Sequence, residues 1–563
     1  AVFLAGCGLP DGWSGRTRFS IAELGFGTGL NVVALLDLWR RSRPSGARLS
    51  VFSVEAHPVG AGDAARALAP WPEIGDLAGM LTARWPGSAR GFHRIDLPEL
   101  HATIDIAVME AAQGVAEWGG RADAWFLDGF SPARNPAMWR AELLRLVAAR
   151  SAPGARLASF TVAGQVRRDL AAAGFVVERR PGFGAKRERL EARLNGTPPS
   201  PRPSPQIAII GAGIAGAALA RAFRAQGATA QVFDAAGPGT GASGGPAALA
   251  APRLDAGLAA PAALFAQAFT RAADLYEATA GAVIARRAIQ LAVGSKDAAR
   301  FETIAASDLF EPGALKRLGA GEIAARLGEA APAGLLIDRA VVVEPAPLLA
   351  AWLGSVRRAR VAAVAPAESG WRLLGERGGT IATADVVCLA AGVENARLAA
   401  GLGLLAVRGQ ASHAGGAAWP VATVFGGYVI PTRDGVLFGA THDRGDESDL
   451  PREADHARNL EAVAAVLPKL AARLEEKGLE AHAAVRAATS DYFPLAGAVS
   501  GHSPGLFVLS GLGSRGFTLA PLLGEHVAAL ALGAPSPLPS ALAALVDPAR
   551  FARRAHRRGR AAG

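Results

Sequence analysis

The sequence predicts two Rossmann-like α/β domains in tandem, the second interrupted by a mixed α+β insertion. Strand-like and helix-like segments alternate on both sides of a proline-rich stretch at residues 195–205. Each half opens with a strand, a glycine loop and a helix, at residues 19–41 and again from residue 206. Such alternation is typical of parallel sheets covered by helices, and 563 residues exceed what one hydrophobic core supports.

Composition narrows the class of protein. Half of the residues are hydrophobic and 19% are charged, which indicates a globular chain. The formal charge of +10 would attract a phosphate backbone, so RNA is a permitted partner. The same richness in arginine and alanine also fits a GC-rich genome, so charge alone does not decide the function.

The two cysteines, Cys7 and Cys388, lie far apart and outside any CxxC spacing. They predict neither a disulfide framework nor a metal site, and they fit a reducing cytoplasm. No strongly apolar run of about twenty residues occurs, so we expect no membrane span. Ala1 is the first residue and no signal-peptide pattern follows it, so we expect a further amino-terminal piece.

Residues 1–194 form the first predicted domain. Residues 2–4 look strand-like, and an antiparallel hairpin between residues 175 and 194 is expected to close the sheet. The remaining strands are expected at 19–24, 49–54, 104–109, 124–127 and 156–160.

A glycine loop follows the first of these strands, in Glu23-Leu-Gly-Phe-Gly-Thr-Gly-Leu-Asn31. Its glycines, Gly25, Gly27 and Gly29, let the backbone turn sharply and approach a ligand, because no Cβ intervenes. Their spacing differs from the GxGxxG fingerprint and resembles the loop of class I methyltransferases, which implies S-adenosyl-L-methionine as cofactor. Two acids at the ends of later strands complete this site, Glu55 for the ribose hydroxyls and Glu110 for the adenine amino group.

Asp128 stands just past the strand at 124–127, where α/β sheets place their chemistry. An amine must lose a proton before its lone pair attacks a methyl sulfonium, and a carboxylate here would orient the amine and help to remove that proton. Alternatively, Asp128 caps the turn that leads to a helix starting at Asn135-Pro136. The sequence leaves both interpretations open.

The second domain is predicted at residues 206–545, after a linker at 195–205 whose prolines favour an extended, semi-rigid chain. It starts with a strand, a GxGxxG loop and a helix. Gly211 makes the turn, Gly213 lets a pyrophosphate approach the backbone, and Gly216 permits close packing of helix on strand. Asp234 ends the next strand at the spacing of a ribose-binding acid.

Three later loops favour FAD over NAD, because they resemble loops of flavin oxidases of the D-amino-acid oxidase type. The first lies at residues 239–245, the second ends the segment Leu389-Ala-Ala-Gly392, and the third opens a carboxy-terminal helix. The resemblance implies that their small residues contact FAD: Ser243, Gly244, Gly392, Gly511, Gly513, Ser514 and Gly516.

Two arginines lie in settings that also resemble these oxidases. Arg486 matches the position that holds a substrate carboxylate, and Arg515 lies in the flavin loop itself. A guanidinium binds a carboxylate through two parallel hydrogen bonds, which would fix the adjacent C–N bond against the flavin. Most arginines of so basic a chain are surface residues, so the motif context carries this assignment.

The rest of the second half is expected to bind the substrate, in two parts at residues 258–340 and 405–490. A helical, alanine-rich region is predicted at 258–330, and a strand-rich region at 405–490. The basic tail at 546–563 ends in an arginine-rich stretch. We expect that stretch to be disordered, with a phosphate-contacting arm as the alternative.

The two halves together resemble one family, the bifunctional tRNA 5-methylaminomethyl-2-thiouridine biosynthesis proteins called MnmC. In the first half the resemblance rests on the glycine loop and on Trp125-Phe-Leu-Asp-Gly-Phe-Ser-Pro-Ala-Arg-Asn-Pro-Ala-Met-Trp139. In the second half it rests on four segments. These are Val407-Arg-Gly-Gln-Ala-Ser412, Gly427-Tyr-Val-Ile-Pro431, Gly439-Ala-Thr-His-Asp443 and Leu512-Gly-Ser-Arg-Gly516.

The resemblance implies two successive reactions on the wobble uridine of tRNA. The FAD-dependent half removes the carboxymethyl group from 5-carboxymethylaminomethyluridine, with Arg486 holding the carboxylate. The other half then methylates the exposed amine from S-adenosyl-L-methionine. The implied protein is cytoplasmic, binds tRNA and no metal, and is expected to be a monomer.

The chain departs from the family at three places. Glu110 stands where Asp is usual, and Gly245 stands where Asn is usual. The family also carries a segment before Val2 that helps to build the methyl-donor site, so methyl transfer depends on it more than oxidation does.

Two other functions stay open on the sequence alone. An FAD oxidase for glycine-like or sarcosine-like amines, fused to a small-molecule methyltransferase, would present the same N-substituted glycine to Arg486. Turnover of free sarcosine without RNA would favour it. A tRNA-binding flavoprotein with a decayed methyltransferase half would keep its flavin and transfer no methyl group.

Overall fold

The computed structural model describes residues 2–129, 131–184, 187–198 and 203–561. The chain divides into two compact units, one made mainly of Ala1–Ser204 and the other mainly of Pro205–Arg224, Ala228–Leu532 and Ala541–Gly563. Within the described residues, every helix is too short or too polar to cross a membrane.

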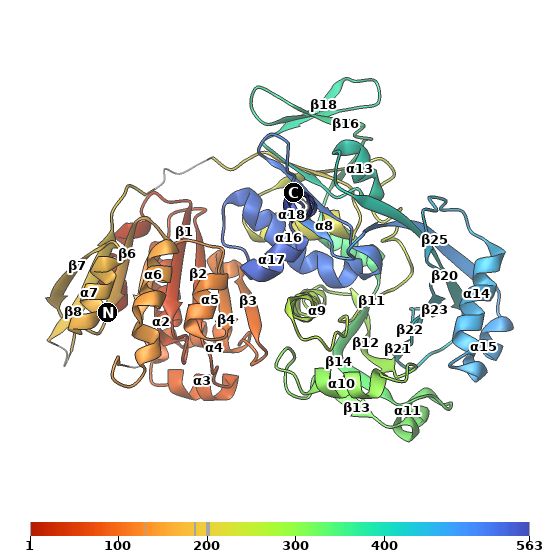
Figure 1. The fold of residues 1–563 in the computed structure, drawn as a ribbon, viewed down its shortest axis with the longest axis horizontal. Coiled ribbons are helices and arrows are strands. Elements are labelled where there is room, and N and C mark those ends of the chain that lie inside the picture. The colour runs from red at the N-terminus through yellow and green to blue at the C-terminus, as the bar shows by residue number, and fades with distance from the viewer. Residues whose placement is uncertain (1, 130, 185–186, 199–202, 562–563) are drawn as a thin grey trace. The chain divides into compact units, whose positions relative to one another are not determined.

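The first unit is built on one sheet covered by helices (Figure 1). Its strand order is β3-β4-β2-β1-β5-β6-β8-β7, and β4, β2, β1, β5 and β6 run parallel. The strands are β1 (Arg18–Leu24), β2 (Arg48–Val54), β3 (Gly91–Leu97), β4 (Ala102–Val108), β5 (Ala122–Leu127), β6 (Ser151–Ser159), β7 (Phe175–Pro181) and β8 (Glu188–Leu194). The helices are α1 (Val2–Gly6), α2 (Leu30–Ser42), α3 (Ala61–Leu68), α4 (Gly75–Thr82), α5 (Ala111–Glu117), α6 (Ala141–Ala149) and α7 (Gly164–Ala172).

Alternate side chains of these strands enter two separate cores. Ile21 and Val51 pack with residues of α2 and α4, whereas Ala22 and Phe52 pack with residues of α5, α6 and α7. Because successive strand residues face opposite sides, both faces of the sheet are buried, as in other parallel sheets. This arrangement leaves the strand ends as the place for a site.

The strands predicted for this unit are confirmed to within a few residues, including the β7–β8 hairpin. The strand predicted at residues 2–4 is wrong, because Val2–Gly6 form helix α1. The ring of Phe3 lies 5.5 Å from the ring of Phe126 in β5. A three-residue apolar run has no period of its own, so packing decides its conformation.

The second unit contains a parallel sheet in the order β15-β10-β9-β19-β27-β26, in which only the edge strand β26 is antiparallel among the described residues. Helix α8 (Ile214–Ala225) follows β9, and α16 (Gly516–Leu532) follows β27. The strands are β9 (Ile207–Ile210), β10 (Ala230–Asp234), β15 (Val356–Arg358), β19 (Val386–Leu389), β26 (Leu495–Ala498) and β27 (Leu506–Ser510).

A larger sheet forms the rest of this unit, in the order β11-β14-β12-β21-β22-β23-β20-β24, with β13 beside β14 and β25 beside β20. Its strands are β11 (Ala248–Ala250), β12 (Val283–Leu291), β13 (Leu315–Leu318), β14 (Gly334–Val343), β20 (Leu404–Gly415), β21 (Ala422–Val424), β22 (Tyr428–Pro431), β23 (Gly435–Gly439), β24 (Asp443–Arg444) and β25 (Leu479–Thr489). A small sheet of β16 (Ala363–Pro366), β17 (Trp371–Leu374) and β18 (Thr380–Ala384) lies apart from it.

The second unit contains further helices between and after these strands. They are α9 (Ala260–Glu277), α10 (Asp297–Ala305), α11 (Ala320–Leu327), α12 (Pro345–Leu353), α13 (Asn395–Leu398), α14 (Glu453–Ala464), α15 (Pro468–Glu475), α17 (Ser540–Val546) and α18 (Arg550–Ala561). The helical region predicted at 258–330 is therefore wrong in part, because β12 and β13 alternate with the helices there. The strand-rich prediction at 405–490 is confirmed, with α14 and α15 added.

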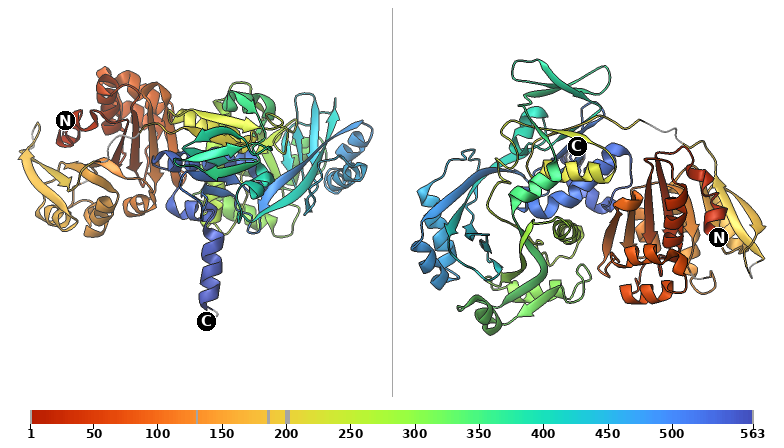
Figure 2. Two further views of the ribbon diagram at one scale, coloured as in Figure 1. Left: turned by 90° about the horizontal axis from the view of Figure 1, so that it is seen from above. Right: turned by 180° about the vertical axis from the view of Figure 1, so that it is seen from behind.

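Residues Arg550–Ala561 of the basic tail form helix α18, so for these residues the prediction of disorder is wrong. Figure 2 shows α18 projecting from the second unit. Arg550 anchors its first turn, since Nε and Nη2 donate to the two carboxylate oxygens of Asp491 at 3.0 and 2.9 Å. Residues 199–202 of the predicted linker and 562–563 of the tail lie outside the described residues.

Candidate active sites

The first candidate site lies where parallel strands of the first unit end. Strands β4, β2, β1 and β5 are neighbours, and Glu110, Glu55, Gly25 and Asp128 follow their carboxyl ends in that order. Because the carboxyl ends of parallel strands meet at one edge, the fold brings the predicted loop and all three acids together.

The glycine loop adopts conformations that require glycine. Gly25, Gly27 and Gly29 have φ of 87°, 52° and 76°, in the region that residues with a Cβ rarely adopt. The Gly27 amide donates to Glu55 Oε2 at 3.0 Å, which ties the acid to the loop. Glu110 precedes α5 and is exposed, and its side chain makes no capping hydrogen bond. The loop and the two acids therefore fit S-adenosyl-L-methionine.

Asp128 is joined to a buried acid through a single amide. Asn31 Nδ2 donates to Asp128 Oδ2 at 2.7 Å and to Glu23 Oε1 at 2.9 Å. The Gly129 amide donates to Asp128 Oδ1 at 2.9 Å, which is the local bond expected of a turn. The hydrogen bond from Asn31, at the start of α2, is not part of this turn. The geometry therefore favours a site role for Asp128, which stays a prediction.

Sequence reasoning missed Glu23 as a site residue. Its side chain is 1% exposed, and Ser53 Oγ donates to its Oε2 at 3.0 Å. Burial raises the pKa of Glu23 to about 8, the hydrogen bond from Asn31 opposes the rise, and the charge of Asp128 adds to it. The available signal was an acid near the carboxyl end of β1, directly before the glycine loop.

We expect Glu23→Gln to flatten the pH dependence of stability. The folded pKa of about 8 lies above the ordinary 4.5, so protonation of Glu23 stabilises the fold fully below pH 4.5 and that contribution is lost as pH rises through about 8. Glutamine has the shape of the neutral acid. The melting temperature of the variant minus that of wild type should therefore be more positive at about pH 9 than at about pH 5. Thermal unfolding at both pH values measures this, and equal shifts at both would contradict it.

The second candidate site is a cavity of about 1130 Å³ within the second unit. Its walls come from the loop between β9 and α8, the loops at 239–245 and 511–516, and strands β20 and β25. Pockets for small ligands span roughly 300–1,000 Å³. This cavity is therefore large enough for a dinucleotide together with a small substrate.

Close backbone contacts test whether the cavity fits FAD. A Cβ on Gly211 would collide with the carbonyl of Ala390, and one on Gly216 would collide with the carbonyl of Gly211. Ser243 Oγ accepts a hydrogen bond from the Ile214 amide at 3.0 Å, which holds the loop at residues 239–245 against the start of α8. A glycine loop at a helix start binds phosphate, so these residues fit the pyrophosphate of FAD.

Asp234 is fixed beside this loop. Its carboxylate accepts hydrogen bonds from the amides of Ala212, Ala236 and Gly237 at 2.8, 2.9 and 2.8 Å. A carboxylate offers about four lone-pair positions, so one is left for a ribose hydroxyl.

The other predicted flavin residues line the cavity, except Gly244, which lies between the lining residues Ser243 and Gly245. A Cβ on Gly244 would collide with the carbonyl of Gly239, and Ser510 Oγ donates to the carbonyl of Gly392 at 2.9 Å. This bond joins Gly392 to the last residue of β27, directly before the loop at residues 511–516. The third loop contributes a group of lining residues, Gly511, Gly513, Ser514 and Gly516.

Arg486 reaches the cavity from β25 and has no acid partner within the part of the chain that the structure describes. A Cβ on Gly409 of β20 would collide with its guanidinium, so a glycine makes the room for this group. Burial lowers the pKa of Arg486, and Tyr428 opposes that change. A buried cation without a counter-ion favours an incoming anion.

Three further groups shape the surroundings of Arg486. Burial lowers the pKa of both His442 and His482, and the charge of Arg486 lowers it further. Arg515 ends the turn before α16, and its Nη1 donates to the carbonyl of Ala251 at 3.4 Å. Burial, with Arg253 adding, lowers the pKa of Arg515 to about 10. Sequence reasoning missed Gly409, Tyr428 and both histidines as site residues.

Two family models match the chain. The family described as S-adenosyl-L-methionine-dependent methyltransferase matches residues 72–195, and the family described as FAD dependent oxidoreductase matches residues 206–530. The chain therefore carries both cofactor-dependent halves. The methyltransferase model matches only from residue 72, which is after the glycine loop. The curated relatives align with nearly the whole chain.

Two curated relatives are named tRNA 5-methylaminomethyl-2-thiouridine biosynthesis bifunctional protein MnmC. The one from Caulobacter sp. (strain K31) is 57% identical over 561 residues, which is 98% of this chain and 93% of the relative. The one from Maricaulis maris (strain MCS10) is 39% identical, over 99% of this chain and 92% of the relative.

Solved structures resemble the oxidase half. Glycine oxidase from Geobacillus kaustophilus has a TM-score of 0.51 and 22% identity, over 59% of this chain and 96% of its own. Iminodiacetate oxidase from Chelativorans sp. BNC1 has a TM-score of 0.50 and 25% identity, over 59% of this chain and 97% of its own. These likenesses confirm the predicted oxidase fold.

Proposed function

The chain belongs to the MnmC family of bifunctional tRNA 5-methylaminomethyl-2-thiouridine biosynthesis proteins, and from this premise we propose which residues carry its two reactions. It is a tRNA wobble-uridine modification enzyme with FAD and S-adenosyl-L-methionine as cofactors. We assign residues 1–194 to methyl transfer, 206–545 to oxidation, 195–205 to the linker and 546–563 to the tail. We place the reaction in the cytoplasm and propose a monomer.

In the oxidase site, Arg486 binds the carboxylate of the carboxymethylamino substituent. The guanidinium offers two parallel donors to the two oxygens, and Gly409 leaves the space that this geometry needs. The lowered pKa of His442 and of His482 disfavours their charged forms, so Arg486 is the favoured cation for the carboxylate. When bound, FAD would accept a hydride from the carbon between the carboxylate and the nitrogen, and addition of water to the resulting C=N bond would release glyoxylate and leave a primary amine. The single observation that supports this assignment is that the Arg486 guanidinium lines the cavity without an acid partner among the described residues.

In the methyltransferase site, Asp128 orients the resulting amine and takes its proton. Asn31 and the Gly129 amide each hold one carboxylate oxygen, so the side chain is fixed before the amine arrives. When bound, S-adenosyl-L-methionine supplies the methyl group. The product of the oxidase half is therefore the nucleophile of the other half.

The decisive experiment follows the wobble nucleoside of hypomodified tRNA by mass. Without S-adenosyl-L-methionine we expect loss of the carboxymethyl group, and with it we expect the methylaminomethyl product. Efficient turnover of free sarcosine with untouched tRNA would instead favour the small-molecule oxidase. Loss of the carboxymethyl group without any methylation would favour the decayed methyltransferase half.

A further inference from the structure

Arg444 and Tyr492 form an exposed stacked pair, called the rim pair below. The guanidinium carbon of Arg444 lies 5.4 Å from the centroid of the Tyr492 ring, and Arg444 Nη2 donates to the tyrosine hydroxyl. Tyr492 is 59% exposed, and Arg444 is also exposed. No carboxylate pairs with Arg444 in the part of the chain that the structure describes. The cation thus lies at the hydroxyl end of the ring, and most of the ring is open to solvent.

The rim pair lies beside the cavity that holds Arg486. Val407 of β20 pairs with Arg444 on one side and with Arg486 on the other. Directly paired residues face the same side of a sheet and neighbouring strands lie about 4.8 Å apart, so the two arginine Cα atoms are roughly 10 Å apart. His442, two residues before Arg444, lines the cavity. When Arg486 binds the carboxylate of the wobble uridine, the nucleotides next to that uridine therefore lie near the rim pair.

The turn that carries Tyr492 is braced in one conformation. Tyr492 has φ of 62°, which is strained for a residue with a large side chain. Thr489 Oγ1 donates to the carbonyl of Phe493 at 2.6 Å across the turn. Burial opposes ionisation of Asp491, but hydrogen bonds from Arg550 and Arg554 outweigh it and hold its pKa below the ordinary value. The ring is therefore presented to solvent by a preformed turn.

We propose that the rim pair is a stacking platform for an unpaired base next to the wobble uridine in the anticodon loop of tRNA. The inference rests on the proposed function and adds the surface that recognises the RNA. Single-stranded RNA is bound by stacking of splayed bases on aromatic rings and guanidinium planes. The uncompensated charge of Arg444 also suits a neighbouring phosphate.

Flavin reduction in the full-length holoenzyme tests this with two substrates. Tyr492→Asn removes the ring with a residue that tolerates positive φ, and Tyr492→Phe keeps the ring. We expect Asn to raise the KM for tRNA by about tenfold with kcat kept, and Phe to stay near wild type. The free nucleoside 5-carboxymethylaminomethyluridine has no neighbouring base. The ratio of kcat/KM on tRNA to that on nucleoside should therefore fall about tenfold in the Asn variant.

Leu450→Asn is the matched control, because Leu450 is a 68% exposed apolar side chain of the same unit. An unchanged KM for tRNA in Tyr492→Asn would overturn the inference. An equal loss on tRNA and nucleoside would also overturn it, as would the same loss in the Leu450 control. Wild-type protein that leaves tRNA unmodified would overturn the proposed function as well, and that result needs no variant.

Discussion

Arg486→Met should abolish oxidation, with kcat/KM on tRNA falling by about 100- to 1,000-fold. The substitution removes the cation that we propose pairs with the substrate carboxylate, and methionine fills a similar volume. Stopped-flow measurement of flavin reduction, on tRNA and on the free nucleoside, gives the size of the loss. Methyl transfer to tRNA that already carries the aminomethyl group should be unchanged and serves as the internal control.

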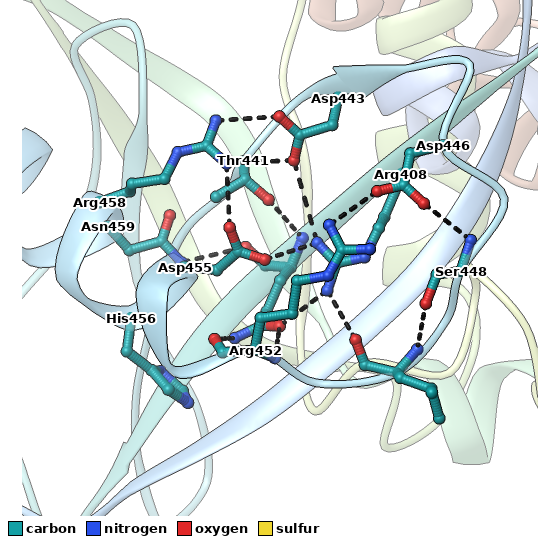
Figure 3. A network of polar contacts seen from close by, with 12 residues as sticks. Arg408, Thr441, Asp443, Asp446, Ser448, Arg452, Asp455, His456, Arg458 and Asn459 are labelled. Carbon is teal, nitrogen blue, oxygen red and sulfur yellow. Dashed lines mark hydrogen bonds and ion pairs between the residues drawn. The ribbon is translucent and has the colours of Figure 1, made fainter.

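The same variant should be at least as stable as wild type, because Arg486 leaves no carboxylate behind among the described residues. Arg408 provides the contrast, as a fully buried arginine of β20 that is paired with an acid (Figure 3). It donates to Asp455 Oδ2 at 2.5 Å, to Gln410 Oε1 at 3.1 Å and to the carbonyl of Leu450 at 2.7 Å. Arg408→Met should cost about 3–5 kcal/mol of unfolding free energy. If Arg486→Met lost as much unfolding free energy as Arg408→Met, the assignment of Arg486 to substrate binding would be wrong.

Asp128→Asn should stop methyl transfer while oxidation continues. Asparagine keeps the shape of the side chain but cannot take a proton from the amine, so the rate should fall by about 100- to 10,000-fold. Mass analysis of the wobble nucleoside should then show accumulation of the aminomethyl product in the presence of S-adenosyl-L-methionine.

Binding of S-adenosyl-L-methionine to Asp128→Asn, measured by calorimetry, separates the chemistry from the cofactor site. We expect binding close to wild type, because the glycine loop and Glu55 do not depend on Asp128 for their hydrogen bonds. Substantial methyl transfer by the variant, or loss of oxidation along with it, would contradict the assigned role.

The glycine loops were predictable because their causes are local. Positive φ at Gly25 and the collision of a Cβ on Gly216 with the carbonyl of Gly211 follow from a few neighbouring residues, and strand, loop and helix are contiguous in sequence. The same holds for Asp128, which the strand before it delivers to the edge of the sheet. The wrong strand at residues 2–4 had no such local constraint.

The surroundings of Arg486 could not be predicted, because they depend on pairing between distant strands. Gly409, Tyr428 and His482 come from β20, β22 and β25, and no sequence spacing shows that they meet. The disorder predicted for the tail failed for the same reason. Asp491 lies 59 residues before Arg550, and the arginine-rich stretch gives no hint of that partner.

Strand β20 has little tolerance for a change in length. It pairs along one edge with β25 and along the other with β23 and β24. Insertion or deletion of a single residue would turn every following side chain to the opposite face. Arg408 or Gln410 would then stand where Gly409 now stands, and its side chain would collide with the Arg486 guanidinium. Members of the family should therefore differ in length in their surface loops. Within β20 they should differ only by substitution.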